Sequence, residues 1–387
     1  MVAVAVVAGE RGEAELRSAG GPVPSHSVPA NSPLIEILSR IVDPDLRRPI
    51  GELGLLRGVE VDASGVAAVG IAVSAANWNA EPLGRSIAAA AKAQDGVEEV
   101  RVDVAFLGAE EQESLAQTLK GETTVGGPSS RTRVIAVASG KGGVGKSSVT
   151  TNVAVALALS GLDVAVIDAD VWGYSIPRML GIERPPQAVA GLIIPPAAHG
   201  VRAISMDFFV PADQAVVWRG PMLHKALEQF LGDVFWDEPD FLLIDMPPGT
   251  GDVAISLSQF LPRSQTVVVT TPQPTAQRVA KRAAAMAEKV NQEVLGVIEN
   301  MSWFTGDDRV RYELFGAGGG EELAGELGVP LLGKIPLVPA MREGADRGEP
   351  VAVAAPDSEA AEAFAAIAAR IVELRPRVRT HPELIIR

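Results

Sequence analysis

Hydrophobic residues along the first 120 positions alternate between helical spacing and strand spacing. Apolar residues between positions 34 and 42 recur three or four places apart, which predicts one buried helix face. Two β-branched runs, at 59–61 and 66–73, flank a turn at 62–65 and predict a hairpin. The same spacings predict two further helices, over 82–92 and 110–119, and a strand over 97–106. The helix-face residues are Leu34, Ile37, Leu38, Ile41 and Val42.

From residue 133 onward, short apolar runs alternate with longer helical patterns. This alternation is typical of βαβ units around a parallel sheet, so we predict an α/β fold with a mostly parallel sheet. None of the predicted strands shows polar alternation, which indicates that helices cover both faces of the sheet. The predicted strands are residues 134–138, 164–167, 241–244, 266–270 and 295–299.

Composition divides the chain into four parts. Residues 9–31 are rich in Gly, Pro, Ser and charge without any period, so we expect residues 1–32 to form a disordered tail. A small α+β domain is predicted over 33–120, and the Gly- and Ser-rich residues 121–132 predict a flexible linker before a second domain over 133–387. The apolar run at 1–8 is too short to span a bilayer and lacks the positive residues of a secretion signal. We therefore expect a cytoplasmic protein.

Charge and cysteine content narrow the possible functions. The chain has 387 residues, of which 34 are Lys or Arg and 48 are Asp or Glu, giving a net charge of −14. This balance argues against nucleic acid or an anionic membrane as a general partner. The chain contains no cysteine, so it cannot by itself build a disulfide, a thiol nucleophile, a zinc finger or a cysteine-ligated iron–sulfur cluster.

A glycine-rich motif directly follows the first strand of the second domain. Residues 140–147 spell Gly-Lys-Gly-Gly-Val-Gly-Lys-Ser, which matches the P-loop pattern between a strand and an apolar helix. Glycines allow backbone N–H groups to point at phosphate oxygens, and the helix N-terminus adds a favourable dipole. Lys146 is predicted to contact the β- and γ-phosphates, and the Ser147 hydroxyl to ligate Mg²⁺. The predicted nucleotide contacts of this segment are Gly140, Lys141, Gly142, Gly143, Val144, Gly145, Lys146, Ser147 and Ser148.

Acidic residues stand at the ends of two other predicted strands. Asp245 ends an apolar run, where a Walker B carboxylate would hold the Mg²⁺ shell. The residues that follow it, 246–252, predict a mobile switch whose Gly249 we expect near the nucleotide. Asp168 and Asp170 form a third acidic element after the strand at 164–167.

The combination of Lys141 with Lys146 gives the deviant Walker A form K-G-G-x-G-K-S, and the chain resembles the Mrp/ApbC family of P-loop ATPases. The first domain resembles the MIP18-like module that precedes many of these ATPases, through Asp43-Pro44-Asp45, Pro49-Ile50 and Leu53-Gly54. Other segments typical of the family are residues 168–181, 218–222, 245–252, 271–274 and 299–302.

The resemblance implies a SIMIBI-type P-loop NTPase that hydrolyses ATP to ADP and phosphate with Mg²⁺ and forms a homodimer across the nucleotide. By the same resemblance, Lys141 would reach the partner's phosphates while Lys146 acts within its own subunit. Asp170 would orient the attacking water, Asp245 would hold the magnesium shell, and Asn300 would hydrogen-bond the adenine edge. The family's role is to deliver iron–sulfur clusters to apo-proteins.

The sequence departs from the cluster-carrying members of that family in one respect. These members have a Cys-x-x-Cys pair shortly after the segment matching 299–302, whereas residues 301–315 contain no thiol, and the loop at 74–79 also lacks the cysteine common in MIP18-like domains. No cluster ligands can therefore be identified. Asp307 and Asp308 predict a surface turn, and the four histidines, His26, His199, His224 and His381, have no metal-ligand spacing.

Three other patterns have structural interpretations that we favour. The glycines of 316–320 predict a tight turn, and the basic residues of the helix after 277 predict a solvated face. The apolar stripe of Phe364, Ile367, Ile371 and Leu374 predicts a helix docked on the ATPase domain. The basic residues are Arg278, Lys281, Arg282 and Lys289.

Two alternative functions stay open at this point. One is an ATP-driven positioning or scaffold switch that binds DNA, membrane or a protein partner. The other is an assembly factor whose MIP18-like domain grips a client protein.

Overall fold

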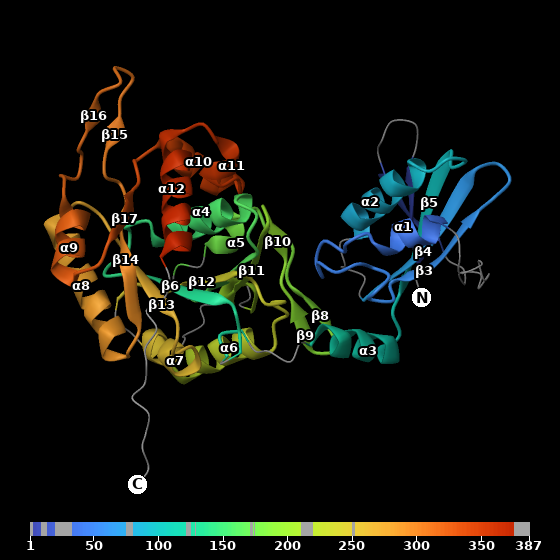
Figure 1. The fold of residues 1–387 in the computed structure, drawn as a ribbon, viewed down its shortest axis with the longest axis horizontal. Coiled ribbons are helices and arrows are strands. Elements are labelled where there is room, and N and C mark those ends of the chain that lie inside the picture. Colours follow the sequence, from blue (N-terminus) through green and yellow to red (C-terminus); the bar gives the residue numbers. More distant parts are fainter. Residues whose placement is uncertain are drawn as a thin grey trace, which may run out of the picture. The chain divides into compact units, whose positions relative to one another are not determined.

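The computed structural model describes residues 3–8, 14–19, 33–74, 80–120, 125–127, 129–170, 173, 175–209, 220–249 and 252–374. The chain divides into two compact units (Figure 1). The first comprises Met1–Gly121 with Pro186–Ile194, and the second comprises Glu122–Pro185 with Pro195–Arg387. Along the described residues, no helix is both long and apolar enough to cross a membrane.

The first unit is the predicted α+β domain. Its five strands lie in the order β2-β1-β5-β4-β3, with β4 and β5 parallel and the other neighbours antiparallel. The predicted hairpin, strand and later helices are confirmed, but the first helix ends at Ser39, so Val42 lies beyond it and is 51% exposed. The elements are β1 (Ala3–Ala8), β2 (Ala14–Ala19), α1 (Pro33–Ser39), β3 (Leu56–Val61), β4 (Val66–Val73), α2 (Ala80–Lys92), β5 (Glu99–Phe106) and α3 (Ala109–Leu119).

The prediction of a disordered tail over residues 1–32 is wrong for two segments. Strand β1 pairs antiparallel with β5, with Val4 opposite Val104, and β2 then pairs with β1. The valines of β1 favour a strand, and β1 adds to the sheet beside β5. Composition cannot reveal this pairing, because β5 lies about 100 positions later in the chain. Residues 20–32 lie outside the described residues.

The second unit is built on an eight-stranded sheet in which every neighbouring pair is parallel except β10 with β11. All five predicted strands are present, and β10, β11 and β17 extend the sheet beyond them. In spatial order the strands are β10 (Ala197–Ala198), β11 (Val201–Ser205), β7 (Val164–Asp168), β12 (Phe241–Asp245), β6 (Arg133–Ser139), β13 (Gln265–Thr270), β14 (Glu293–Glu299) and β17 (Leu331–Lys334).

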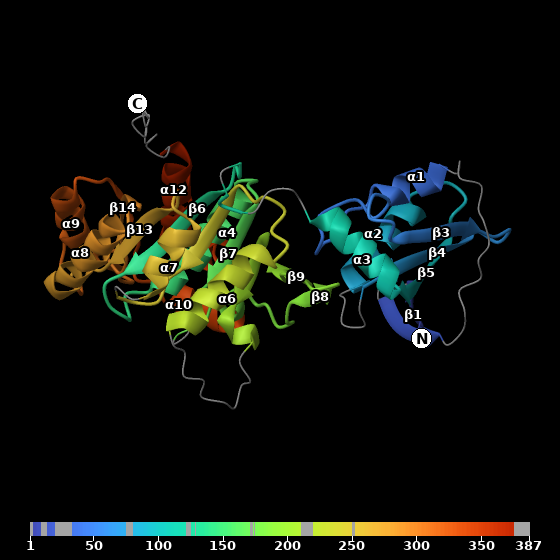
Figure 2. The ribbon, with the colours of Figure 1, turned by 90° about the horizontal axis from the view of Figure 1, so that it is seen from below.

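Helices cover both faces of this sheet, as predicted (Figures 1 and 2). Alternate residues of β13 show it: Val267 and Val269 belong to the core formed with α4 and α12, whereas Val268 belongs to the core formed with α8 and α9. The helices of this unit are α4 (Lys146–Leu159), α5 (Ile176–Met179), α6 (Gly220–Gly232), α7 (Asp252–Phe260), α8 (Pro274–Lys289), α9 (Gly319–Leu327), α10 (Pro339–Arg347), α11 (Val351–Ala354) and α12 (Glu359–Glu373), with a 3₁₀ turn at Met206–Phe209.

The C-terminal apolar stripe docks on the second unit, as predicted. Phe364 and Ile367 of α12 are fully buried against α4 and β17. The Arg133 guanidinium donates hydrogen bonds to the carbonyl oxygens of Ile371 (2.9 Å) and Leu374 (2.7 Å). These bonds satisfy carbonyls that the end of a helix leaves without intrahelical partners.

Among the described residues, two short hairpins lie outside the five- and eight-stranded sheets. The hairpin of β8 (Gln187–Val189) and β9 (Leu192–Ile194) groups with the first unit, although it lies within the stretch 133–387 that we predict as one domain. Such an excursion leaves no mark on composition, because its residues are as apolar as the strands around them. The second hairpin, β15 (Phe304–Thr305) with β16 (Arg311–Tyr312), holds the predicted surface turn at Asp307 and Asp308.

Candidate functional site

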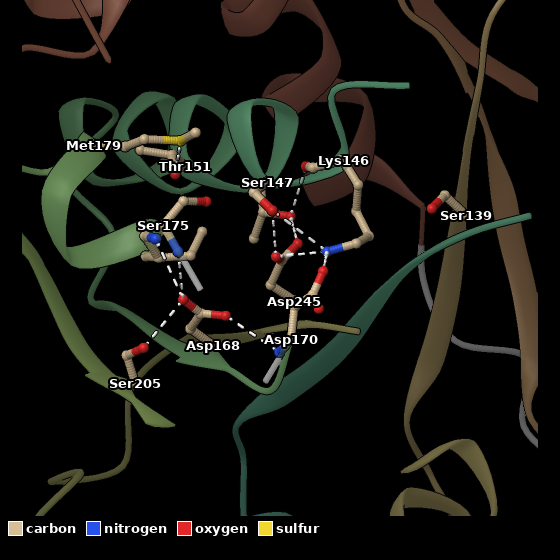
Figure 3. A network of polar contacts seen from close by, with 12 residues as sticks. Ser139, Lys146, Ser147, Thr151, Asp168, Asp170, Ser175, Met179, Ser205 and Asp245 are labelled. Carbon is tan, nitrogen blue, oxygen red and sulfur yellow. Dashed lines mark hydrogen bonds and ion pairs between the residues drawn. The ribbon is translucent and has the colours of Figure 1, made fainter. Parts of the chain in front are cut away.

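The candidate site lies where three neighbouring strands end. Strand β6 leads into the loop 140–145 and then α4, while β7 ends at Asp168 and β12 at Asp245. Asp168 and Asp245 are directly opposite each other in the register of the two parallel strands. The carboxyl edge of the sheet therefore brings two acidic residues beside the glycine-rich loop (Figure 3).

Two glycines show why the loop needs this residue type. Gly145 has φ +80° at the start of α4, and a Cβ there would lie 2.3 Å from the Asn300 Nδ2 atom. A Cβ on Gly140 would lie 2.1 Å from the Val279 carbonyl carbon in α8. The loop backbone is therefore packed closely between the site and α8, with the amino end of α4 facing the site.

Lys146 is buried between two carboxylates. Its Nζ lies 2.6 Å from Asp245 Oδ2 and 3.4 Å from Asp170 Oδ2, and it is 6% exposed. The Ser147 hydroxyl donates to the same Asp245 oxygen at 2.6 Å. The structure thus brings together four residues that the sequence assigned to the site: Lys146, Ser147, Asp170 and Asp245 (Figure 3).

Asp168 holds the segment that carries Asp170. Its Oδ1 accepts the Asp170 N–H at 3.2 Å, and its Oδ2 accepts the N–H groups of Ser175 and Ile176 and the hydroxyl of Ser205. Burial, with the nearby negative charge of Asp245, raises the pKa of Asp168 to about 7. The sequence indicated Asp168 only as part of an acidic pair, because its partner Ser205 lies on β11, a strand the sequence analysis did not predict.

The remaining predicted residues surround the loop. Asn300 is buried, and its Nδ2 donates to the Val144 carbonyl at 2.9 Å, so the side chain supports the loop. Lys141 Nζ donates to Gln273 Oε1 at 3.2 Å, at the start of α8. The Gly249 N–H donates to the Ser139 carbonyl at 3.0 Å, which ties the segment after Asp245 to the start of the loop. Ser148 lies in the first turn of α4.

The oxygen donors at this site suit magnesium. The Ser147 hydroxyl and the Asp245 carboxylate are hard ligands 2.6 Å apart, and Mg²⁺ typically takes one or two protein oxygens with water and phosphate completing its shell. Within the described ranges, no group of three or more His, Asp or Glu residues could hold a metal on its own. An iron–sulfur cluster does not fit, because its irons need thiolates and the chain has no cysteine.

Two of the other patterns have the predicted structural roles. Of the glycine run, Gly318 has φ +79° and caps α9, and a Cβ on Gly319, the first residue of that helix, would lie 2.4 Å from the Pro272 carbonyl oxygen, so the run is a tightly packed helix start. On the basic face of α8, Lys281 pairs with Glu326 at 3.0 Å and both side chains are about half exposed. Neither feature adds a ligand to the site.

Family models match both domains. Residues 130–372 match the model described as NUBPL iron-transfer P-loop NTPase, and residues 33–104 match one described as iron–sulfur cluster assembly protein. The chain belongs to the NUBPL-type P-loop NTPase family. The resemblance stated from the sequence and the predicted P-loop α/β fold are thereby confirmed.

Curated relatives and a solved structure agree with this membership. An iron–sulfur cluster carrier protein of Mycobacterium tuberculosis is 44% identical over 340 residues, which is 85% of this chain and 89% of the relative. A protein of the same name from Synechocystis is 40% identical over 348 residues, covering 87% and 96%. A nucleotide-binding protein from Archaeoglobus fulgidus, solved with ADP, superposes with a TM-score of 0.52 at 35% identity, covering 60% of this chain and 91% of its own.

Proposed function

We propose that this chain is a magnesium-dependent ATPase that converts ATP to ADP and phosphate and acts in iron–sulfur cluster assembly on apo-proteins in the cytoplasm. The observation that carries the ATPase part is the contact of Lys146 and Ser147 with Asp245 at the glycine-rich loop. Family membership supports nucleotide hydrolysis in general, and the names of the relatives support the iron–sulfur role.

Each site residue has a distinct task in this proposal. The loop N–H groups of 140–145 and the amino end of α4 bind the phosphate oxygens, together with Ser148. Lys146 binds the β- and γ-phosphates, and Asp170, beside Lys146, orients the attacking water. Ser147 and Asp245 would hold Mg²⁺, Asp245 through water, and the ion supplies positive charge that offsets the charge on the phosphate oxygens.

Two further roles belong to the nucleotide's surroundings. The hydrogen bond from the Gly249 N–H to the Ser139 carbonyl keeps Gly249 near the phosphates. Asn300 hydrogen-bonds the adenine edge after its hydrogen bond to Val144 breaks. The bond lost to Val144 and the bond gained to adenine both go to neutral acceptors and are each worth about 1 kcal/mol net, so the exchange costs little free energy.

Lys141 is proposed to act in a homodimer. Its ammonium group is bound to the neutral Gln273 amide rather than to a carboxylate, so release from this contact costs little. In the dimer it would reach the partner's phosphates and offset charge on the transferred phosphoryl group, as an arginine finger does.

The absence of cysteine means that another molecule must supply the thiolate ligands of any iron–sulfur cluster. Carboxylates are poor substitutes for the thiolates that hold iron–sulfur clusters, and the four histidines have no metal-ligand spacing. We therefore propose that the cluster is cargo whose thiolate ligands come from a client apo-protein or an assembly partner, while this chain supplies the ATP-driven step.

Anaerobic reconstitution tests the cargo part of the proposal. The purified chain is incubated with iron and sulfide, desalted, and read by visible absorption and iron content, alone and with a cysteine-containing apo-protein. We expect no cluster on the chain alone and faster cluster transfer to the apo-protein when ATP is present. A stable cluster on the isolated chain, or transfer rates indifferent to both chain and ATP, would contradict this role.

A further inference from the structure

A buried threonine one turn into α4 contacts the carboxylate at the centre of the site. Thr150 is fully buried, and its Oγ1 lies 2.7 Å from Asp245 Oδ1. The same hydroxyl lies 3.0 Å from the carbonyl of Lys146, the usual back-bonding partner of a helical threonine. One hydroxyl carries one proton, and the ionised carboxylate is both the closer and the stronger acceptor. The Thr150 hydroxyl therefore donates its hydrogen bond to Asp245.

This contact divides the two oxygens of Asp245 between different donors. Oδ2 accepts from Lys146 and Ser147, the two residues proposed to bind phosphate and Mg²⁺. Oδ1 accepts from Thr150, which has no role in the proposed site. The terminal torsion of an aspartate is broad, so hydrogen bonds decide the plane of its carboxylate. Once Lys146 and Ser147 turn to phosphate and metal, Thr150 is the donor that keeps this plane fixed.

We propose that Thr150 is a positioning residue for magnesium: by binding Oδ1, it holds Asp245 so that Oδ2 faces the Ser147 hydroxyl. The inference rests on the proposed function of this site. It concerns affinity for Mg²⁺ with nucleotide, and not the affinity for nucleotide alone, since the Thr150 hydroxyl bonds Asp245 and the Lys146 carbonyl and none of the loop N–H groups.

The neighbouring threonine provides a matched control. Thr151 is equally buried and lies on the same helix, but its hydroxyl contacts the Met179 sulfur at 3.7 Å (Figure 3). Replacing either threonine by valine removes one buried hydroxyl and keeps the shape of the side chain. Only the Thr150 change removes a donor from Asp245.

The test compares Thr150→Val, Thr150→Ala, Thr150→Ser and Thr151→Val with the wild-type chain. Affinity for a fluorescent ADP analogue is measured in excess Mg²⁺ and in EDTA, and the Mg²⁺ concentration for half-maximal phosphate release is measured at saturating ATP. Loss of one charge-assisted hydrogen bond should raise that concentration by about 10-fold in the valine and alanine variants. In these two variants the ratio of ADP-analogue affinity in Mg²⁺ to that in EDTA should fall by a similar factor. The affinity in EDTA itself should not change. Thr150→Ser and Thr151→Val should behave like wild type.

Three results would overturn the proposal. These are wild-type magnesium dependence in Thr150→Val and Thr150→Ala, an equal loss of ADP affinity in Mg²⁺ and EDTA, or the same magnesium shift in Thr151→Val. If the valine variant does not fold, the alanine variant decides. A wild-type chain that releases no phosphate would instead refute the proposed ATPase, and the ADP measurements would still decide the role of Thr150.

Discussion

Lys141 is the site residue whose proposed role depends on a second subunit. Lys141→Ala should leave nucleotide affinity unchanged, because its side chain contacts Gln273 and not the loop interior. Phosphate release should fall by at least about 100-fold, as expected when a charge donor to the transferred group is lost. Lys281→Ala, which removes an exposed lysine paired with Glu326, is the control and should hydrolyse normally. Equal rates in the two variants would remove Lys141 from the mechanism.

Asp170 is proposed to act on water after ATP has bound. Asp170→Ala should therefore bind ATP, fail to hydrolyse it and accumulate as a dimer, because ATP persists between the subunits. Size-exclusion chromatography in excess Mg·ATP measures this directly, with the variant of the exposed Asp346, Asp346→Ala, as a control that stays mainly in the resting form. A variant that elutes only as monomer would count against the role of Asp170.

Asp168 links the site to pH-dependent stability. Its pKa is raised by burial from 3.8 to about 7, so the folded protein holds a proton that the unfolded chain releases between these values. The stability contributed by this group is full below about pH 4 and is lost as pH rises toward 7. Asp168→Asn cannot ionise, so its unfolding free energy in urea should fall less than that of wild type from about pH 4.5 to 7.5. Parallel pH profiles for the two proteins would contradict the assignment.

At the scale of elements, the side chain of Arg133 in β6 binds the C-terminal end of α12. Arg133→Met keeps an unbranched side chain but loses the guanidinium, which lies over the Phe241 ring and donates to the carbonyls of Ile371 and Leu374. We expect a loss of about 1–3 kcal/mol in unfolding free energy, measured in urea. Arg370→Met, which breaks an exposed pair with Glu373 on the same helix, should change stability by less than about 0.5 kcal/mol. Equal effects would show that Arg133 does not hold the helix.

Periodicity predicted the elements whose partners are near in sequence or covered on both faces. The central strands β6, β7, β12, β13 and β14 are continuous apolar runs, and their positions followed from that alone. Strand β17 is only four residues long and β1 depends on a distant edge, so neither gives a strong local pattern. Local spacing also cannot reveal that residues 187–194 group with the first unit.

For the candidate site, the sequence predicted the main residues but not the contacts that orient them. The motif identified Lys146 and Ser147, and strand ends identified Asp168, Asp170 and Asp245. The contacts that orient them were not predictable: Ser205 reaches Asp168 from a strand 37 residues away, and Thr150 is an unremarkable threonine in an apolar helix until Asp245 is placed beside it. Motifs record which residues meet the ligand, whereas supporting contacts depend on the register of distant strands.

At the scale of the whole molecule, a net charge of −14 and the absence of cysteine bear on different functions. The charge argues against nucleic acid as a general partner, and the basic residues of α8 do not reverse it, since Lys281 is paired with Glu326. Because the chain has no thiols, we propose that another protein supplies the thiolate ligands of the cluster. The chemistry proposed for the chain itself is therefore the nucleotide reaction.

That reaction is tested most directly by phosphate release from saturating Mg·ATP, compared between the wild-type chain and Lys146→Ala. Circular dichroism confirms that the variant is folded, because loss of Lys146 leaves two buried carboxylates without their cation. We predict steady phosphate release by the wild type that stops in EDTA, and release at the level of buffer in Lys146→Ala. Equal rates in the two proteins, or hydrolysis that persists in EDTA, would contradict the account.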